Sequence, residues 1–265
     1  MKFTAALAAA VLAGVATAAP ERGLEARLKA RASTKSSRPL QSVDRPSTVK
    51  NQTNVEYSSN WSGAVLVEPP SAAATYTAVT GTFTVPEPTG SGSGSQAASA
   101  WVGIDGDTYG NAILQTGVDF TIEDGEVSFD AWYEWYPDYA YDFSGIDISA
   151  GDEIVAIVES YSSTSGIAII ENKSTGQKVS KTLSSSSNLG GQNAEWIVED
   201  FEEGGSLVNL VDFGTVTFTG AVAAVAGGST VGLEDATIIE IEDESGQVVT
   251  DVTIDSDSSV TITYV

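Results

Sequence analysis

Carboxyl and aromatic side chains alternate with apolar ones in the run Val127–Tyr136, whose sequence is VSFDAWYEWY. Successive side chains of a strand point to opposite faces, so one face of this run is apolar and the other mixes rings with carboxylates. A solvated face seldom carries tryptophan and tyrosine, whereas a concave binding face uses rings for contact area and carboxylates for direction. The mixed face consists of Ser128, Asp130, Trp132, Glu134 and Tyr136.

Three further segments alternate in the same way, namely Trp101–Asp105, Ile113–Asp119 and Glu195–Phe201. If all four strands lie in one sheet, their mixed faces would line a single groove. The candidate groove residues are Trp101, Asp105, Gln115, Asp130, Trp132, Glu134, Tyr136 and Glu195. Alternation alone does not establish that the strands are neighbours. A ring covered by a loop, or an acid on a solvated surface, would follow the same pattern.

Histidine and cysteine are both absent from the 265 residues. Their absence excludes Ser-His-Asp and Cys-His catalysis, disulfides, and metal sites built on histidine or cysteine. No side chain has an ordinary pKa near neutrality, so carboxyl groups are the expected proton carriers. The formal net charge of -24 argues against a nucleic-acid partner, because such binding depends on cationic side chains. We expect no metal and no cofactor.

The sequence after residue 55 predicts an all-β domain, because short runs rich in Val, Ile, Thr, Tyr and Phe recur between clusters of Gly, Ser, Asn and Asp. Ser/Gly-rich Gly90–Ser99 and Ser184–Gly191 predict long exposed loops, and Val208–Phe213 is ambiguous. This spacing of strands favours an antiparallel sandwich or jelly roll. Besides the four segments above, the expected strands are Tyr76–Val85, Glu153–Tyr161, Ile167–Asn172, Thr215–Thr219, Ala236–Glu242 and Ser259–Val265.

The first 18 residues have the features of a secretory signal peptide. Lys2 supplies the charged start, Phe3–Val15 is apolar and rich in alanine, and Ala16-Thr17-Ala18 fits the small-x-small cleavage pattern. About 13 apolar residues are too few to span a bilayer, so we expect a secreted protein with no membrane partner. Three N-x-S/T sequons, at Asn51, Asn60 and Asn172, would accept glycans if they were exposed.

The charge changes sign near residue 50. Residues 1–50 hold nine basic and three acidic side chains, whereas residues 51–265 hold three basic and 33 acidic ones. The polar, Arg/Ser-rich residues 19–53 could be a disordered linker or a removable pro-segment. We favour a pro-segment, because opposite charge would hold it across an acidic groove as an intramolecular inhibitor and acid would release it. Residues 54–265 would then form the mature acidic domain, which we expect to be monomeric.

Six blocks of this sequence, in order, resemble the fungal glutamic peptidases, the eqolisin family. The blocks are YSSNWSGAVL (57–66), GTFTVPEP (81–88), WVGIDG (101–106), ILQTGVDF (113–120), FDAWYEWYPD (129–138) and AEWIVEDF (194–201). The resemblance implies a secreted acid endopeptidase that acts on proteins and peptides and is made with a signal peptide and a pro-segment. It also implies a sandwich of two antiparallel sheets, like that of concanavalin A-type lectins.

By motif, the resemblance implies that Gln115 of LQTG and Glu195 of AEW are the catalytic pair. It also implies that the other six candidate groove residues bind substrate. A carboxylate at residue 195 can take a proton from water and later donate it to the leaving amine. The Gln115 amide can accept from the water and donate to the developing oxyanion. This reaction requires neither a metal nor a covalent intermediate.

Two other functions are compatible with an aromatic groove on such a fold. A jelly-roll glycosidase could use Glu134 and Glu195 as its two carboxylates, although the usual pair of glutamates on one strand is absent. A lectin-like module could bind sugars on the aromatic rings. Such modules often use calcium, and Asp251, Asp255 and Asp257 are too loosely spaced to indicate a calcium loop.

Overall fold

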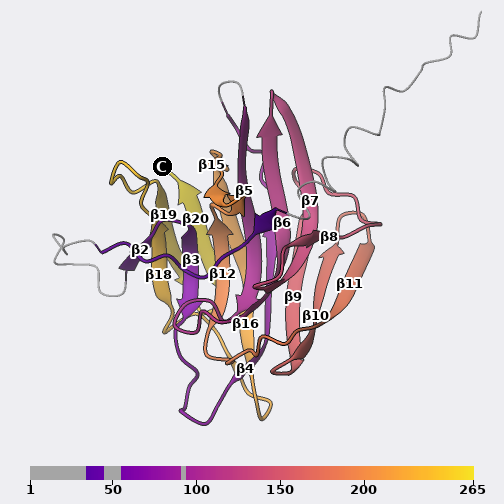
Figure 1. Cartoon of the computed structure of the whole chain (residues 1–265), viewed down its shortest axis with the longest axis vertical. Helices are drawn as coiled ribbons and strands as arrows, with labels where there is room; N and C mark the ends of the chain where they lie inside the picture. Colours follow the sequence, from indigo (N-terminus) through magenta and orange to yellow (C-terminus); the bar gives the residue numbers. More distant parts are fainter. Residues whose placement is uncertain (1–33, 45–54, 91–93) are drawn as a thin grey trace, which may run out of the picture.

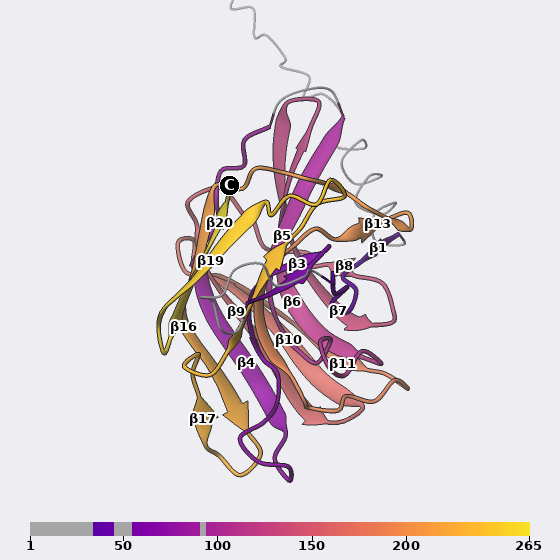
Figure 2. The same cartoon turned by 90° about the vertical axis from the view of Figure 1, so that its left-hand side faces the viewer.

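The computed structural model describes residues 34–44, 55–90 and 94–265. All regular elements in these ranges are β-strands, and two large sheets pack face to face (Figures 1 and 2), which confirms the predicted all-β sandwich. The expected signal peptide, residues 1–18, and most of the expected pro-segment, residues 19–53, lie outside the described residues. Within the described ranges, no helix is long and apolar enough to cross a membrane.

One sheet of nine strands carries the candidate groove residues, and we call it the site sheet. Its pairings are antiparallel except for β2 with β18 and β15 with β5, which are parallel. In spatial order the strands are β2 (Val55–Ser58), β18 (Thr237–Ile241), β3 (Trp61–Leu66), β12 (Ala194–Glu199), β5 (Ser95–Ile104), β6 (Ile113–Glu123), β7 (Glu126–Tyr136) and β8 (Tyr141–Asp142), with β15 (Asn209–Leu210) beside β5.

The other sheet has eight strands and is antiparallel throughout. We call it the back sheet. In spatial order its strands are β11 (Gln177–Ser184), β10 (Ser165–Asn172), β9 (Glu153–Ser162), β4 (Tyr76–Thr84), β16 (Thr215–Val225), β20 (Ser259–Tyr264) and β19 (Thr250–Ser256), with β17 (Thr230–Val231) beside β16.

The core lies between the two sheets and is filled by the apolar alternate residues of both. Trp196 of β12 is fully buried there, and its Nε1 donates to the Thr80 carbonyl of β4 at 2.8 Å. Gly81 lies under this ring, because a Cβ atom at that position would come within 2.9 Å of it. The indole therefore fastens the site sheet to the back sheet directly behind the strand that carries Glu195.

The predicted strands all exist, with ends that differ by a few residues. The loop prediction for Gly90–Ser99 is wrong in part, because β5 begins at Ser95, where its small polar residues pair with β6. Strand β11 was not predicted. Its sequence QKVSKTLS is mostly polar because β11 lies at the edge of the back sheet, where many side chains face solvent.

Residues 34–44, the N-terminal segment, cross the site sheet on the face that points away from the core. Their first residues form β1 (Lys35–Ser36), which pairs with β13 (Glu202–Glu203) and, through it, β14 (Ser206–Leu207) in a small third sheet (Figure 2). The chain then runs toward β2. The Leu40 amide donates to the carbonyl of Gly106, just after β5, at 2.9 Å, and the Val43 amide donates to the carbonyl of Tyr57 in β2 at 2.8 Å. This segment covers the face on which the candidate residues lie.

Candidate functional site

Gln115 and Glu195 lie in one row across three adjacent strands. In the ladder, Glu195 of β12 is paired with Gly103 of β5, and Gly103 is paired with Gln115 of β6. Glu134 of β7 continues the row as the partner of Gln115. Residues that are directly opposite on a sheet point to the same face, so these side chains all project from the site sheet away from the core, on what we call the site face.

Gly103 leaves the space that the two flanking side chains share. A Cβ atom built there would lie 2.8 Å from the Trp101 ring, 3.1 Å from Glu195 Oε1 and 3.4 Å from Gln115 Cβ. Neighbouring strands are roughly 5 Å apart, so residues two strands apart can meet only across a position without a side chain. Glycine in the middle of the row therefore lets Glu195 lean toward Gln115.

The Glu195 carboxyl is fully buried, and neither of its oxygens has a hydrogen-bond partner. Gln115 Oε1 is also buried without a partner. Burial raises the pKa of Glu195 well above its usual range, and the nearby charges of Asp105 and Asp107 raise it further. Three buried oxygens therefore accept no hydrogen bond from the described residues, and they could bind a small polar reactant such as water.

Asp105 holds the loop that leads into β12. Its carboxylate accepts hydrogen bonds from the amides of residues 190 and 192 at 2.7 Å, of residue 191 at 2.9 Å and of residue 193 at 3.4 Å. Burial still raises the pKa of Asp105, because desolvation outweighs these four donors. The sequence predicted a substrate-binding residue here. The structure directs this carboxylate to the backbone just before Glu195, where it sets the position of the strand.

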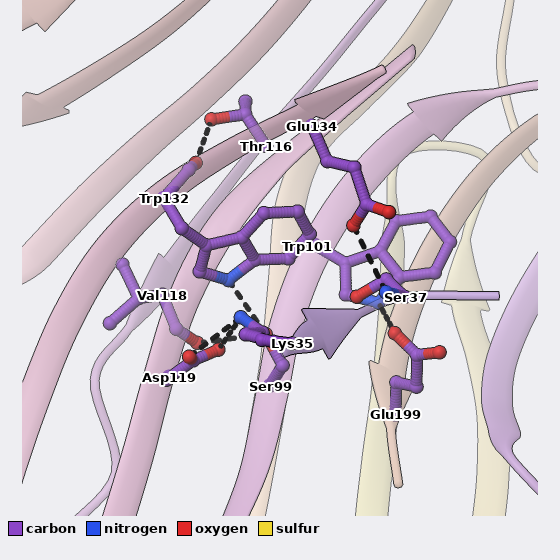
Figure 3. A network of polar contacts seen from close by, with 10 residues as sticks. All are labelled: Lys35, Ser37, Ser99, Trp101, Thr116, Val118, Asp119, Trp132, Glu134 and Glu199. Carbon is purple, nitrogen blue, oxygen red and sulfur yellow. Dashed lines mark hydrogen bonds and ion pairs between the residues drawn. The ribbon is translucent and has the colours of Figure 1, made fainter. Parts of the chain in front are cut away.

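A second row on the site face is built around Glu199, four residues after Glu195. One of its oxygens accepts a hydrogen bond from Trp101 Nε1 at 2.9 Å (Figure 3), and the other accepts one from Trp61 Nε1 at 3.3 Å. The two indoles meet edge to face, with ring centroids 5.0 Å apart. Burial raises the pKa of Glu199 to about 8, so this carboxyl is largely protonated below neutrality.

Trp132 of β7 lies beside Trp101 in the middle of the site face. Its Nε1 donates to Ser99 Oγ at 2.9 Å, and its carbonyl accepts from Thr116 Oγ1 at 2.6 Å (Figure 3). Between the two tryptophans lies Gly117, where a Cβ atom would come within 2.5 Å of the Trp101 side chain. Tyr136 packs against the same aromatic cluster.

The N-terminal segment contacts this face through charged and polar groups. Lys35 Nζ lies 2.6 Å from both carboxylate oxygens of Asp119 and 4.0 Å above the Trp132 ring (Figure 3). Ser37 donates its amide to Glu134 Oε2 at 3.0 Å, and its carbonyl accepts from Gln115 Nε2 at 2.9 Å. Burial raises the pKa of Glu134 well above its usual range, although the Ser37 amide and the Lys35 charge both lower it.

The predicted residues are thus brought to one face, and four further ones join them. Asp130 is the ladder partner of Asp119, which places a predicted acid beside an unpredicted one. Asp119 and Glu199 could have been found, because alternation places them on the same face as Gln115 and Glu195. Trp61 gave no such signal, because every residue of β3 is buried and no polar face stands out, and Asn60 lies just before that strand.

Two of the three sequons cannot carry glycans in this fold. Asn60 is 1% exposed, and its amide nitrogen donates to the carbonyls of Arg38 and Pro39. Asn172 is fully buried, and its amide nitrogen donates to the Asp147 carbonyl and the Asp152 carboxylate. Asn51 lies outside the described residues. Both described asparagines serve as buried hydrogen-bonding residues.

Comparison with known proteins gives the family. The chain matches the Peptidase A4 family over residues 59–264. Over the full length of both chains it is 51% identical to aspergillopepsin-2 of Aspergillus niger and 43% identical to scytalidopepsin B of Scytalidium lignicola. A crystal structure of scytalido-glutamic peptidase with a transition state analog inhibitor matches with a TM-score of 0.71 and 44% identity, over 78% of this chain and 98% of that one. The resemblance found in the six sequence blocks is confirmed, and this chain belongs to the Peptidase A4 family, the eqolisins or glutamic peptidases, which hydrolyse peptide bonds.

Proposed function

We propose that this chain is a secreted, acid-acting glutamic endopeptidase in which Glu195 and Gln115 perform the chemistry. The observation that carries the assignment is the row Glu195–Gly103–Gln115, in which Gln115 Nε2 already donates to a peptide carbonyl, that of Ser37. Trp101, Asp130, Trp132, Glu134 and Tyr136 would hold the substrate, with Asp105 fixing the loop before Glu195. Secretion is proposed from the signal-like residues 1–18.

In this mechanism the ionised Glu195 takes a proton from water as the water oxygen attacks the carbonyl carbon. Gln115 stabilises the oxyanion, because its amide nitrogen is a donor at hydrogen-bond distance from a carbonyl oxygen held in this position. Glu195 then returns the proton to the leaving nitrogen. No group of three or more acidic side chains among the described residues is arranged to hold a metal ion, and the steps above call on none.

The N-terminal segment acts as an intramolecular inhibitor in this proposal. It covers the catalytic pair, and its Lys35 is buried against Asp119 while Arg38 Nε lies 2.8 Å from Glu202 Oε2. Burial also raises the pKa of Glu195, which favours its protonated form, and a protonated carboxyl cannot accept a proton from water. Acid weakens the ion pairs, and once the segment leaves, hydration lowers the Glu195 pKa again.

We expect the change Lys35→Met to make the full chain active under milder conditions. Removing the ammonium breaks the buried ion pair with Asp119, at a cost of about 3 kcal/mol or more, so the segment should leave the site face more often. The initial rate on a fluorogenic peptide in mildly acidic buffer should rise by at least about tenfold. The matched control is Lys178→Met, which removes an exposed pair with Glu171. Equal rates for the unchanged chain and the Lys35 variant would refute the inhibitory role.

The proposed activity is tested by offering two substrates to the acid-treated chain. Denatured globin should be cut into peptides at about pH 3, while polysaccharides should release no sugars, and inhibitors of serine, cysteine and metallo-peptidases should have no effect. Release of sugars without peptides would instead support the carboxylate-based glycosidase. Binding to a glycan without any hydrolysis would support the lectin-like module.

A further inference from the structure

The peptide unit between Ser37 and Arg38 lies at the centre of the site face. Ser37 is fully buried, and its carbonyl oxygen is the one that Gln115 Nε2 holds at 2.9 Å. On the other side of the same residue, its amide donates to Glu134 at 3.0 Å. The carbonyl of this one residue is therefore oriented by the side chain that would stabilise an oxyanion.

The chain before this peptide unit is anchored on the β7 side of the site face. Lys35 and Ser36 form β1, which adds to β13 as an antiparallel strand. The Lys35 ammonium is held by Asp119, and Ser36 Oγ donates to Glu134 Oε1 at 3.1 Å. Main-chain pairing with side chains in fixed positions is a common mode of binding for an extended peptide.

The chain after this peptide unit is anchored independently, on the β3 side. Asn60 contacts three residues of the segment, since its Nδ2 lies 3.4 Å from the Arg38 carbonyl and 3.3 Å from the Pro39 carbonyl, and its Oδ1 accepts from the Gln41 amide at 2.9 Å. The Leu40 amide donates to the Gly106 carbonyl. Loosening one flank would leave the other in place, so the Ser37 carbonyl can stay near Gln115 while water enters.

We propose that the Ser37–Arg38 peptide bond is the first bond this chain cuts, within its own molecule, when it is activated. This inference rests on the proposed peptidase function and adds the site at which the chain begins to process itself. A water oxygen bonds to the Ser37 carbonyl carbon, the carbon–nitrogen bond to Arg38 breaks, and the proton passes through Glu195 to the Arg38 nitrogen. The products are a Ser37 carboxyl group and an Arg38 amine, with no change of oxidation state.

A cut at this position explains how a firmly held inhibitor is lost. After the cut, the part of the segment held through Lys35 would be a separate peptide, while the part held by Asn60 would remain as the new N-terminus of the domain, and each part would bind the site face with fewer contacts. Loss of the link between two binding elements removes the high effective concentration that each gives the other. Later cuts in residues 45–54 would complete the separation of the mature domain.

The experiment follows all new chain ends in time after the full-length protein is moved from neutral to acidic buffer. Mass spectrometry should find Ser37 as the earliest new C-terminus and Arg38 as the earliest new N-terminus, formed at a first-order rate that does not change over a tenfold dilution. The Glu195→Gln full-length chain should remain uncut in the same buffer. Three results would each overturn the proposal. New chain ends could form earlier at another position, the first-order rate constant of the cut could rise in proportion to protein concentration, or the Glu195→Gln chain, incubated by itself, could form the same ends.

Digestion of denatured globin, run in parallel, distinguishes this inference from the function on which it rests. Globin peptides together with a first cut elsewhere would overturn the Ser37–Arg38 assignment and leave the peptidase function intact. Intact globin together with an uncut chain would overturn both.

Discussion

The change Glu195→Gln is expected to lower the rate of peptide-bond hydrolysis by about 10⁴-fold, the upper end of what general acid–base catalysis supplies. The large effect is expected because one carboxyl serves twice, first as the base for water and then as the acid for the leaving amine. Glutamine keeps the shape of the side chain and cannot carry the proton. The measurement is kcat/KM on a fluorogenic peptide in acid, with enzyme whose N-terminal segment has been removed by an added peptidase.

The fold of this variant should be unaffected, which makes the loss interpretable. Burial raises the pKa of Glu195, which favours the neutral carboxyl in the folded protein, and a neutral amide replaces it without burying a new charge. The melting temperature should therefore match that of the unchanged protein in acid. A matched control is Glu171→Gln, an exposed glutamate on β10 that should leave activity unchanged.

The partner change Gln115→Ala should cost about 10²–10³-fold, the usual range for removing one oxyanion donor. The double variant should be little slower than Glu195→Gln alone, because residues that act on the same transition state are not additive. Activity within a few-fold of the unchanged enzyme in either single variant would show that the catalytic pair lies elsewhere.

Alternation in the sequence predicted which face each candidate residue occupies, because the strand period is a local property. Val102, Val118 and Trp196 lie in the core, while Trp101, Gln115 and Glu195 lie on the opposite face. The register between strands is a non-local property. No local pattern showed that Gly103 would stand between Gln115 and Glu195, and the role of that glycine follows only from the ladder.

The N-terminal segment shows the same difference between local and non-local information. Opposite charge predicted that residues 19–53 would lie against an acidic groove, and the described part of them, residues 34–44, does lie on the site face. Charge could not predict that Ser37, an uncharged residue, would be the one whose carbonyl meets Gln115. That placement depends on how far apart the two anchoring sites lie on the site face, Asp119 for Lys35 and Asn60 for the residues after Ser37, and only the folded structure supplies this distance.

The sequence motif and the structure suggest different roles for Asp105. The motif placed it among the substrate-binding residues, and its left-handed backbone, with φ of 70°, turns the chain sharply after β5. Its carboxylate then faces the amides of residues 190–193 instead of open space. A sequence shows that an aspartate follows a strand, but the loop it binds is 85 residues away.

Buried carboxyls should make this protein more stable near pH 4 than near pH 8. Burial raises the pKa of Glu199 from 4.5 to about 8 and that of Asp200 from 3.8 to about 8, and it also raises the pKa of Glu134 and Glu195. A folded pKa above the unfolded value means that the folded state binds the proton more tightly. The resulting stability is fully present below about pH 4 and is lost as the pH rises through about 8.

The size of this effect can be judged from Glu199, which is fully buried. A shift from 4.5 to about 8 corresponds to roughly 5 kcal/mol between the two ends of that range. Chemical denaturation of the full-length Glu195→Gln chain, which cannot digest itself if the proposed mechanism holds, should show the free energy of unfolding falling by several kcal/mol from pH 4 to pH 8. Adding Glu199→Gln should flatten the fall, because the amide accepts from the Trp101 indole without titrating. Adding Glu171→Gln, on the exposed surface, should leave the slope unchanged.

A free energy of unfolding that is equal at the two pH values would show that these carboxyls remain hydrated in the folded protein. Their ionised forms would then be available at neutral pH, and the inhibition proposed here would depend on the covering segment alone.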